Sequence, residues 1–320
     1  MGHCSIRDPR VIVRARPAIE DSQMSLLRIA RAAALIIVAT PTLCFAQDKY
    51  FNSAGVRLRY LEQGAGEPVV LVHGFGNTAE IWSANGIVQD LSRNYRVISF
   101  DARGHGKSDK PHEAARYGRE MGLDIVRLLD HLNIQRAHVV GYSLGGYVVS
   151  QLLTLRPERF LSATLIAGSG RFNWDSTRAA LAETEAGERE RECISRSMLF
   201  RLAPPSAPRP SEDSLRALSA KCLADSTQDR FAFAAITRSR ADQAMTPAAT
   251  AAVTVPTLAV VGSDDPEKAG LDALVQLRPS VRLVVVSGAT HGGPRGVLGR
   301  PELISALRQF LSRDPAKDPH

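Results

Sequence analysis

The sequence predicts an α/β protein with a mostly parallel central sheet flanked by helices and an inserted helical cap. Apolar, strand-like runs alternate with helical patterns from residue 56 to residue 170, and this alternation resumes at residue 257. Strands that alternate with helices along a chain form parallel sheets covered on both faces. Residues 171–250 interrupt the pattern, because they are rich in Arg, Glu, Ala and Ser and contain a cluster of prolines between 203 and 210.

The first strands are predicted from two different patterns. Residues 56–61 alternate apolar and charged side chains, which indicates a half-exposed antiparallel strand at an edge of the sheet. Residues 68–72 are continuously apolar, as in a strand buried on both faces. By the same criteria we expect strands at 95–100, 137–140 and 161–166, and helices at 78–91, 117–132 and 147–155.

The rest of the chain completes the predicted division into parts. The cap is expected to contain helices near 177–200, 212–223 and 228–244. Strands are predicted at 257–261 and 281–286, and helices at 269–277 and 301–311. The chain is therefore divided into an N-terminal extension with a signal peptide at 1–46, a first core part at 47–170, the cap at 171–250, a second core part at 251–313 and a loose tail at 314–320.

Composition restricts the class of protein. With 320 residues, of which 44% are hydrophobic and 23% charged, the chain suits one large α/β domain with an insertion. The net charge of +7 arises partly in residues 1–46, and no basic run is interleaved with aromatic residues, so we expect no nucleic-acid partner. The sequence shows no cluster with metal-ligand spacing and no dinucleotide or phosphate loop, and we therefore expect no cofactor.

The N-terminal extension has the three parts of a secretory signal. A short positive region at 24–31 precedes an uncharged apolar stretch, and small residues follow where a signal peptidase reads the chain, which predicts cleavage between Ala46 and Gln47. The apolar stretch is short and interrupted by Pro41, so no stable membrane span is expected after cleavage. A lipid anchor on Cys44 and a buried N-terminal helix are the alternatives. We expect an exported protein, periplasmic or secreted.

Two cysteines remain after removal of the signal, Cys193 and Cys222. An even number of cysteines in an oxidising compartment favours a disulfide. Two unpaired core thiols are the alternative at this stage.

A short motif supplies a candidate nucleophile. Residues 137–140 are strand-like, and Gly141-Tyr142-Ser143-Leu144-Gly145 follows them directly before an apolar helix. Gly-x-Ser-x-Gly between a strand and a helix is the nucleophile elbow pattern, in which a strained turn lifts the serine hydroxyl above the sheet. The two glycines suit the close approach of neighbouring backbone. The alternative is an exposed serine in a glycine turn.

Other strand ends carry the groups that a serine nucleophile needs. A serine is activated by a histidine base whose tautomer is fixed by a carboxylate. His291 follows the last predicted strand, and Asp264 and Asp265 follow the strand at 257–261. The order Ser143, Asp265, His291 is the one expected for this elbow. The backbone N–H groups of Leu144 and of Phe75 are expected to form the oxyanion hole.

These motifs together resemble the α/β-hydrolase fold superfamily, and in particular serine hydrolases with a helical cap. The motifs that carry the resemblance are His73-Gly74-Phe75-Gly76, Phe100-Asp101-x-Arg103-Gly104-His105-Gly106-x-Ser108, Gly141-Tyr142-Ser143-Leu144-Gly145-Gly146, Gly262-x-x-Asp265 and Gly288-Ala289-Thr290-His291. They cover residues 50–170 and 255–313. The spacing in the family favours Asp265 over Asp264 as the acid.

The resemblance also implies roles for the other motif residues. His73 is expected to shape the loop that carries Phe75. Asp101, Arg103 and His105 are expected to form a hydrogen-bonded structural corner. Thr290 replaces the more usual glycine before the histidine, which affects only the local loop shape.

The predicted function is that of a serine hydrolase that cleaves a carboxylic ester of a small molecule through an acyl-enzyme. Dehalogenases and epoxide hydrolases of this fold use Asp at the elbow, so Ser143 disfavours both. Hydrolysis of an amide, lactone, thioester or carbon–carbon bond remains an alternative. So does a non-catalytic member of the fold that binds a ligand. The cap is expected to set substrate preference.

Overall fold

A computed structural model describes residues 47–172, 174–204 and 206–312. The predicted signal peptide, its cleavage position and the tail at 314–320 involve residues outside these ranges. Among the described residues, no helix has the length and apolar character needed to cross a membrane.

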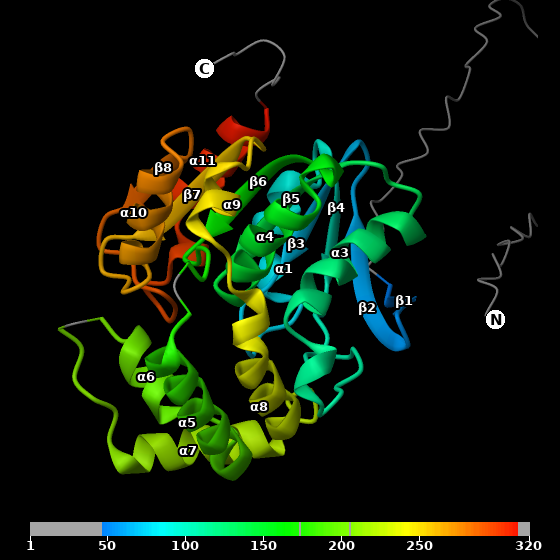
Figure 1. The fold of residues 1–320 in the computed structure, drawn as a ribbon. Coiled ribbons are helices and arrows are strands. Elements are labelled where there is room, and N and C mark those ends of the chain that lie inside the picture. Colours follow the sequence, from blue (N-terminus) through cyan, green and yellow to red (C-terminus); the bar gives the residue numbers. More distant parts are fainter. Residues whose placement is uncertain (1–46, 173, 205, 313–320) are drawn as a thin grey trace, which may run out of the picture. The chain divides into compact units, whose positions relative to one another are not determined.

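Within the described ranges, eight strands form one sheet in the order β1-β2-β4-β3-β5-β6-β7-β8 (Figure 1). The pairs β1–β2 and β2–β4 are antiparallel, and every other neighbouring pair is parallel. The predicted α/β fold class, with its mostly parallel sheet, is confirmed. The strands are β1 Lys49–Ser53, β2 Val56–Gln63, β3 Glu67–Val72, β4 Tyr95–Phe100, β5 Ala137–Tyr142, β6 Phe160–Ile166, β7 Thr257–Gly262 and β8 Arg282–Val286.

The prediction of an edge strand at 56–61 was wrong in one respect, because β1 lies outside β2 and forms the edge. The charged side chain of Arg59, which suggested solvent exposure, is only 3% exposed. Its guanidinium lies 2.6 Å from both Asp48 and Glu80 and 3.0 Å from Asp101. The alternating pattern therefore predicted a strand correctly, but the charged side chain of Arg59 forms buried ion pairs and is not exposed to solvent.

Helices cover both faces of the sheet and bury two hydrophobic clusters. One cluster contains side chains of α3, α4 and α10, and the other contains side chains of α1, α2 and α11. The predicted helix at 78–91 is broken at Gly86, whose φ of 74° requires a left-handed backbone. These helices are α1 Ile81–Ala84, α2 Ile87–Leu91, α3 Arg119–His131, α4 Leu144–Leu155, α10 Lys268–Leu277 and α11 Pro301–Leu311.

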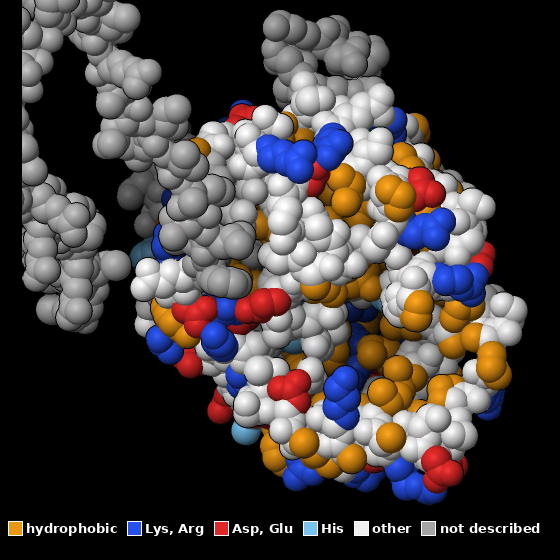
Figure 2. Space-filling model, turned by 180° about the vertical axis from the view of Figure 1, so that it is seen from behind, with side chains coloured by type: hydrophobic (Ala, Val, Ile, Leu, Met, Phe, Trp, Pro, Cys, Tyr) orange, Lys and Arg blue, Asp and Glu red, His pale blue; other side chains and the backbone are white. Residues whose placement is uncertain are grey.

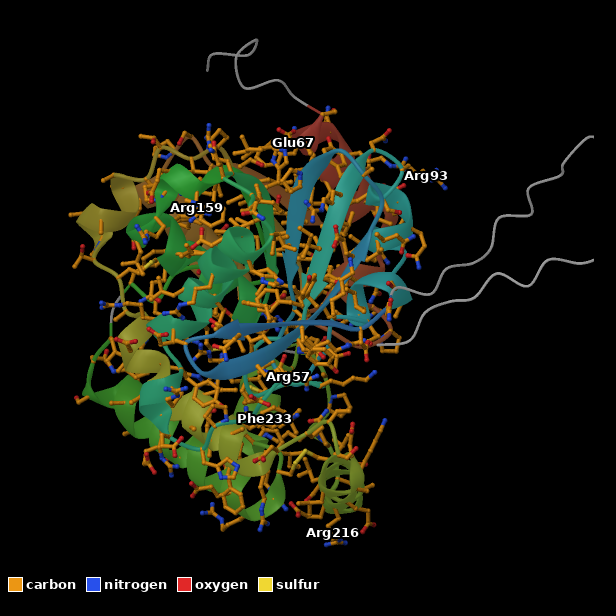
Figure 3. All side chains as sticks on the ribbon, turned by 90° about the vertical axis from the view of Figure 1, so that its right-hand side faces the viewer. Arg57, Glu67, Arg93, Arg159, Arg216 and Phe233 are labelled. Carbon is orange, nitrogen blue, oxygen red and sulfur yellow. A yellow bond between two sulfur atoms is a disulfide. The ribbon has the colours of Figure 1, made fainter. Side chains whose placement is uncertain are left out.

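In the described part of the chain, five α-helices lie between β6 and β7, and we call α5 to α9 the helical insertion. They are α5 Ser176–Glu192, α6 Arg196–Leu202, α7 Glu212–Ala224, α8 Arg230–Arg238 and α9 Pro247–Ala251. In Figure 1 the green to yellow helices α5 to α8 lie together beyond one end of the strands. Figure 3 shows Phe233 of α8 on the side of the insertion that faces the sheet.

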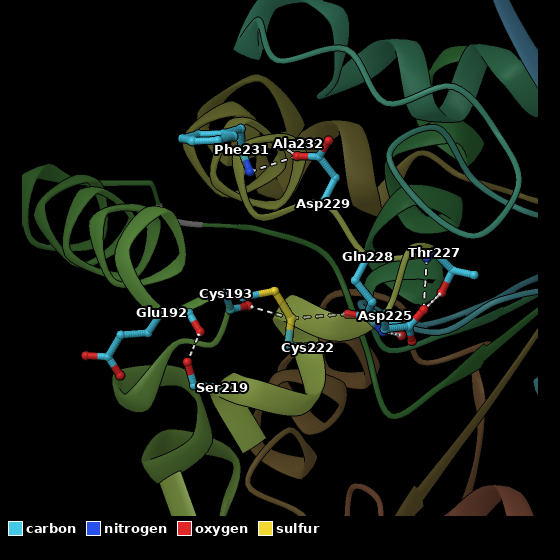
Figure 4. Close-up of a disulfide and its surroundings, with 11 residues drawn as sticks. Glu192, Cys193, Ser219, Cys222, Asp225, Thr227, Gln228, Asp229, Phe231 and Ala232 are labelled. Carbon is cyan, nitrogen blue, oxygen red and sulfur yellow. Dashed lines mark hydrogen bonds between the residues drawn. A yellow bond between two sulfur atoms is a disulfide. The ribbon is translucent and has the colours of Figure 1, made fainter. Parts of the chain in front are cut away.

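A disulfide joins Cys193 to Cys222 within the insertion (Figure 4). Cys193 ends α5 in a left-handed conformation with φ 63°, which breaks the helix predicted at 177–200 into α5 and α6. The Oγ of Ser219 donates a hydrogen bond to the carbonyl of Glu192 at 2.6 Å, one residue from the disulfide. The end of α5 and the body of α7 are therefore held together both covalently and by a hydrogen bond.

Candidate active site

Ser143 lies on the turn between β5 and α4. Its φ of 52° and ψ of −112° are strained for a residue with a side chain. Its N–H donates to the carbonyl of Ile166 on the neighbouring strand at 2.8 Å, which holds the turn in place. A Cβ atom at Gly141 would lie 2.3 Å from the Gly145 carbonyl oxygen, and one at Gly145 would lie 2.1 Å from the Val72 carbonyl oxygen. The motif therefore needs both glycines for close backbone approach.

Three side chains from three strand ends meet in a hydrogen-bonded line. The Oγ of Ser143 lies 2.9 Å from Nε2 of His291. The Nδ1 of His291 lies 3.1 Å and 3.0 Å from the two carboxylate oxygens of Asp265. Asp265 is buried and also accepts a hydrogen bond from the N–H of Glu267 at 2.9 Å. The structure thus brings together the three residues that the sequence predicted as catalytic.

Neighbouring groups hold His291 in this position. The hydroxyl of Tyr142 donates to the His291 carbonyl oxygen at 2.7 Å, and the two rings stack with centroids 5.7 Å apart. The sequence reasoning did not identify this role of Tyr142, although the residue stands next to the nucleophile. Asp264, the competing acid, lies 3.3 Å from Arg295.

The predicted oxyanion hole lies between the loop after β3 and the start of α4. Neither the N–H of Phe75 nor that of Leu144 donates a hydrogen bond to another group among the residues that the structure describes. His73 shapes this loop, because its Nε2 accepts from the N–H of Ala102 at 3.0 Å and its Nδ1 lies 2.8 Å from the Gly74 carbonyl. Since Nε2 accepts, the proton must be on Nδ1. Burial lowers the pKa of His73, which keeps the ring neutral.

The turn after β4 forms the expected structural corner. Arg103 is buried and forms two hydrogen bonds to the carboxylate of Asp124. Asp101 is fully buried and accepts from the guanidinium of Arg59. The His105 ring packs against that of Phe75 with centroids 5.5 Å apart, and burial holds the pKa of His105 well below its usual value. These residues support the loop that carries Phe75.

A pocket of about 190 Å³ opens beside Ser143 between the core and the helical insertion. Figure 2 shows a hollow on one face, where Lys or Arg side chains lie among hydrophobic ones. Three of the residues that line the pocket, Phe75, Ser143 and Leu144, are among the predicted site residues. The others are Tyr147, Arg171, Trp174, Arg178, Leu181, Met198, Arg201, Leu202, Arg240 and Glu267.

Comparisons with known proteins identify the fold and the family. A family model described as alpha/beta hydrolase fold matches residues 67–293, a range that includes Ser143, Asp265 and His291. The structure of a thermophilic esterase from Thermogutta terrifontis superposes with a TM-score of 0.67 at 26% identity, covering 83% of this chain and 98% of that one.

Two curated relatives are similar over a shorter stretch. The dihydrolipoyllysine-residue acetyltransferase component of the acetoin cleaving system of Cupriavidus necator is 38% identical over 126 residues, or 39% of this chain and 33% of that protein. The 2-hydroxymuconate semialdehyde hydrolase of Pseudomonas sp. is 35% identical over 120 residues, or 37% of this chain and 42% of that protein. The chain therefore spans less than half the length of these two relatives.

Proposed function

Because the chain belongs to the alpha/beta hydrolase fold family, we propose that it is a serine hydrolase that cleaves a carboxylic ester through an acyl-enzyme intermediate. The observation that carries the proposal is the line of hydrogen-bonding groups from Ser143 through His291 to the buried carboxylate of Asp265. This arrangement supplies a nucleophile, a base and a group that orients the base. The similarity in fold to an esterase adds support.

The first half of the reaction forms the acyl-enzyme. Nε2 of His291 takes the proton of the Ser143 hydroxyl as its oxygen attacks the ester carbonyl. The carbonyl oxygen becomes an oxyanion, which the N–H groups of Phe75 and Leu144 stabilise. The protonated His291 then gives its proton to the alkoxy oxygen, and the alcohol leaves. Asp265 stabilises the imidazolium that forms between these two steps.

The second half releases the acid. His291 takes a proton from a water molecule, and the resulting hydroxide attacks the acyl carbon. The oxyanion forms again in the same hole, and its collapse breaks the bond to Ser143. His291 returns the proton to the serine oxygen, which restores the starting state. The products are one alcohol and one carboxylic acid.

The test is turnover of p-nitrophenyl acetate and butyrate by the protein and by Ser143→Ala. We expect Ser143→Ala to lower kcat on the order of 10⁶-fold, as the loss of the nucleophile does in another serine hydrolase. The adjacent acids provide a matched pair. We expect Asp265→Asn to lower kcat about 10⁴-fold because it disturbs the histidine tautomer, and Asp264→Asn to leave kcat nearly unchanged.

Three other outcomes would contradict the proposed ester hydrolysis by Ser143. Equal rates for the protein and Ser143→Ala would exclude Ser143 as the nucleophile. Labelling of Ser143 by a fluorophosphonate probe without ester turnover would indicate a different scissile bond, such as an amide, lactone, thioester or carbon–carbon bond. Neither labelling nor turnover would favour a ligand-binding member of the fold.

We also propose that the protein is exported after cleavage between Ala46 and Gln47. The sequence pattern of residues 24–46 supports this, and so does the Cys193–Cys222 disulfide, since disulfides persist in oxidising compartments. Mass spectrometry of the protein purified from an expressing bacterium should show Gln47 at the N-terminus. A cytoplasmic protein that keeps residues 1–46 would contradict the proposal.

A further inference from the structure

Arginine side chains gather beside the nucleophile. Arg171, Arg201 and Arg240 line the pocket that contains Ser143, and Arg189 lies next to it against Phe75 and Met198. We call these four residues the arginine cluster. The four side chains differ in their interaction partners. Those that form ion pairs with carboxylates stabilise the fold, whereas those without a carboxylate partner among the described residues have N–H donors available for a ligand.

Two members of the arginine cluster share two carboxylates. Arg240 lies 2.6 Å from a carboxylate oxygen of Glu185. Arg201 lies 3.5 Å from Glu185 and 3.2 Å from Glu267. These ion pairs connect α5 and α6 with the segment after α8 and with the loop before α10, so their role is structural.

Arg171 has no carboxylate partner among the described residues. Its Nε donates to the side-chain oxygen of Gln243 at 3.2 Å, and its guanidinium lies 4.1 Å from the ring centroid of Tyr147. A guanidinium has five N–H donors, so most of those of Arg171 are not used by the protein. Its partly buried side chain lines the pocket.

Like Arg171, Arg189 forms no ion pair with a carboxylate among the described residues, and it is more deeply buried. It is 2% exposed, its Nε donates to the hydroxyl of Thr237 at 3.1 Å, and its guanidinium lies 4.1 Å from the Phe75 ring centroid. Nowhere in the described ranges is a carboxylate within ion-pair distance of it. Burial lowers the pKa of Arg189 to about 9 and that of Arg171 to about 10, so both remain charged near neutral pH.

The arginine cluster therefore carries a surplus of positive charge. Four guanidiniums face the two carboxylates of Glu185 and Glu267. Glu188 is close enough to Arg189 to raise its pKa, although its carboxylate oxygens accept from Ser195 and Ser197. When the carboxylate of Glu188 is counted with those of Glu185 and Glu267, four guanidiniums face three carboxylates, so one positive charge remains. Unpaired charge in a low-dielectric site is unfavourable, and an anion that entered the pocket would neutralise it.

Arg171 lines the same pocket as Ser143, and Tyr147 connects the two residues. Tyr147 stands one helical turn after Ser143, and its N–H donates to the Ser143 carbonyl at 3.1 Å. Its hydroxyl is hydrogen-bonded to Glu267, which fixes the ring that carries the Arg171 guanidinium. The backbone of Arg171 is also held, because its carbonyl accepts from the N–H of Met245 at 3.0 Å. Arg171 is thus pre-positioned on the wall of the pocket.

We propose that this pocket binds substrates that carry a carboxylate besides the scissile ester, and that Arg171 binds this carboxylate. The proposal rests on the proposed function and specifies its substrate class. A guanidinium matches a carboxylate with two parallel hydrogen bonds, and such charge-assisted bonds are strong. The guanidinium of Arg189 next to the pocket, which also has no carboxylate within ion-pair distance among the described residues, adds to the attraction. Half-esters of small dicarboxylic acids have the required chemistry.

The experiment compares two esters of equal chain length, mono-p-nitrophenyl glutarate and p-nitrophenyl valerate, after subtraction of the enzyme-free rates. We expect kcat/KM of the protein to be at least 10-fold higher for the anionic glutarate ester. Arg171→Gln should lower kcat/KM for this ester about 10- to 100-fold, mainly through KM, and change the valerate rate less than about 3-fold. Arg171→Lys should restore part of the loss.

Two controls separate local binding from general charge and from folding. Arg93→Gln removes an exposed positive charge outside the pocket and should leave the ratio of the two rates unchanged (Figure 3). Arg171→Gln should melt no lower than the unmodified protein, since it removes a charge without a carboxylate partner. Equal kcat/KM for the two esters, or an equal loss with both in Arg171→Gln, would overturn the proposal.

Direct binding distinguishes this proposal from the proposed function. Trp174 lines the same pocket, so its fluorescence can report binding of free glutarate. Glutarate should change this fluorescence in the unmodified protein, and Arg171→Gln should need a concentration at least 10-fold higher. If that result were obtained without turnover of either ester, the anion site would stand and the ester hydrolase function would fall. No glutarate binding together with Ser143-dependent turnover of the valerate ester would give the reverse conclusion.

Discussion

Gly145→Ala should damage both stability and activity, although helix propensity alone predicts the opposite. Gly145 lies in the first turn of α4, where alanine is intrinsically more favourable than glycine by about 0.5–1 kcal/mol. However, a Cβ atom there would lie 2.1 Å from the carbonyl oxygen of Val72 and 2.9 Å from that of His73. Both contacts are with backbone at the end of β3, so no flexible side chain can move aside.

The size of the effect follows from this overlap. An ordinary contact requires about 1 Å more, and overpacking of this kind costs about 1–3 kcal/mol. The end of β3 leads directly into His73, Gly74 and Phe75, so any separation of α4 from β3 also moves the predicted oxyanion donor of Phe75 away from Ser143. A displacement of about 1 Å at a catalytic site can lower the rate about 10²-fold. We therefore expect a loss of at least 1 kcal/mol in the free energy of unfolding and of about 10²-fold in kcat/KM.

Gly122→Ala is the matched control. Gly122 lies in α3, and a Cβ atom there would meet the Leu152 side chain at 3.5 Å, an ordinary contact. This substitution should raise the free energy of unfolding by about 0.5–1 kcal/mol and leave kcat/KM unchanged. Urea denaturation and p-nitrophenyl butyrate turnover measure the two quantities. If Gly145→Ala were as stable and as active as Gly122→Ala, the argument from close backbone approach would be refuted.

Two further predictions concern stability. Cys193→Ser should lower the free energy of unfolding by about 3–4 kcal/mol, because the disulfide closes a loop with a sequence separation of 29 in the unfolded chain. A reductant should destabilise the unmodified protein to the level of the variant in a thermal melt, and a variant melting at the original temperature would contradict this. Burial lowers the pKa of His73 and His105 below their ordinary value of 6.5, so below that pH the unfolded chain binds protons that the folded chain does not. Stability should fall as the pH drops from about 6.5, by up to about 1.4 kcal/mol per pH unit for each histidine, and urea midpoints that stay constant from pH 7.5 to 5 would disprove the effect.

The parallel strands of the core could be predicted because burial on both faces leaves a continuous apolar run. Edges and helix breaks could not be predicted with equal accuracy. The strand β1 has the sequence Lys-Tyr-Phe-Asn-Ser, which has no strong pattern, and Arg59 on β2 is buried against the distant carboxylates of Glu80 and Asp101. The breaks at Gly86 and Cys193 depend on left-handed backbone conformations. For Cys193, which is not a glycine, nothing in the local sequence indicates one.

The candidate site was partly predictable for a topological reason. Parallel strands end at the same edge of a sheet, so Ser143 after β5, Asp265 after β7 and His291 after β8 were all expected at that edge. Strand topology could not decide which acid contacts His291, since Asp264 and Asp265 lie in the same loop. The choice depends on which carboxylate turns inward, and the structure shows that Asp265 is buried against His291 whereas Asp264 pairs with Arg295. The contact by which Tyr142 holds His291 depends on the direction of the Tyr142 side chain, which the sequence pattern does not predict.

No local sequence pattern predicts the arginine cluster, because its members come from separate segments of the chain. Arg171 comes from the segment after β6, Arg189 from α5, Arg201 from α6 and Arg240 from the segment after α8, so no short sequence window contains all four. In sequence, each resembles an ordinary solvated charge. The core contains the proposed nucleophile, base and acid, whereas the inserted segment between β6 and β7 supplies arginine side chains that line the same pocket. Because the hydrogen bonds that join Ser143, His291 and Asp265 involve only core residues, exchange of Arg171 should change which substrate is bound and leave the proposed chemistry of bond cleavage intact.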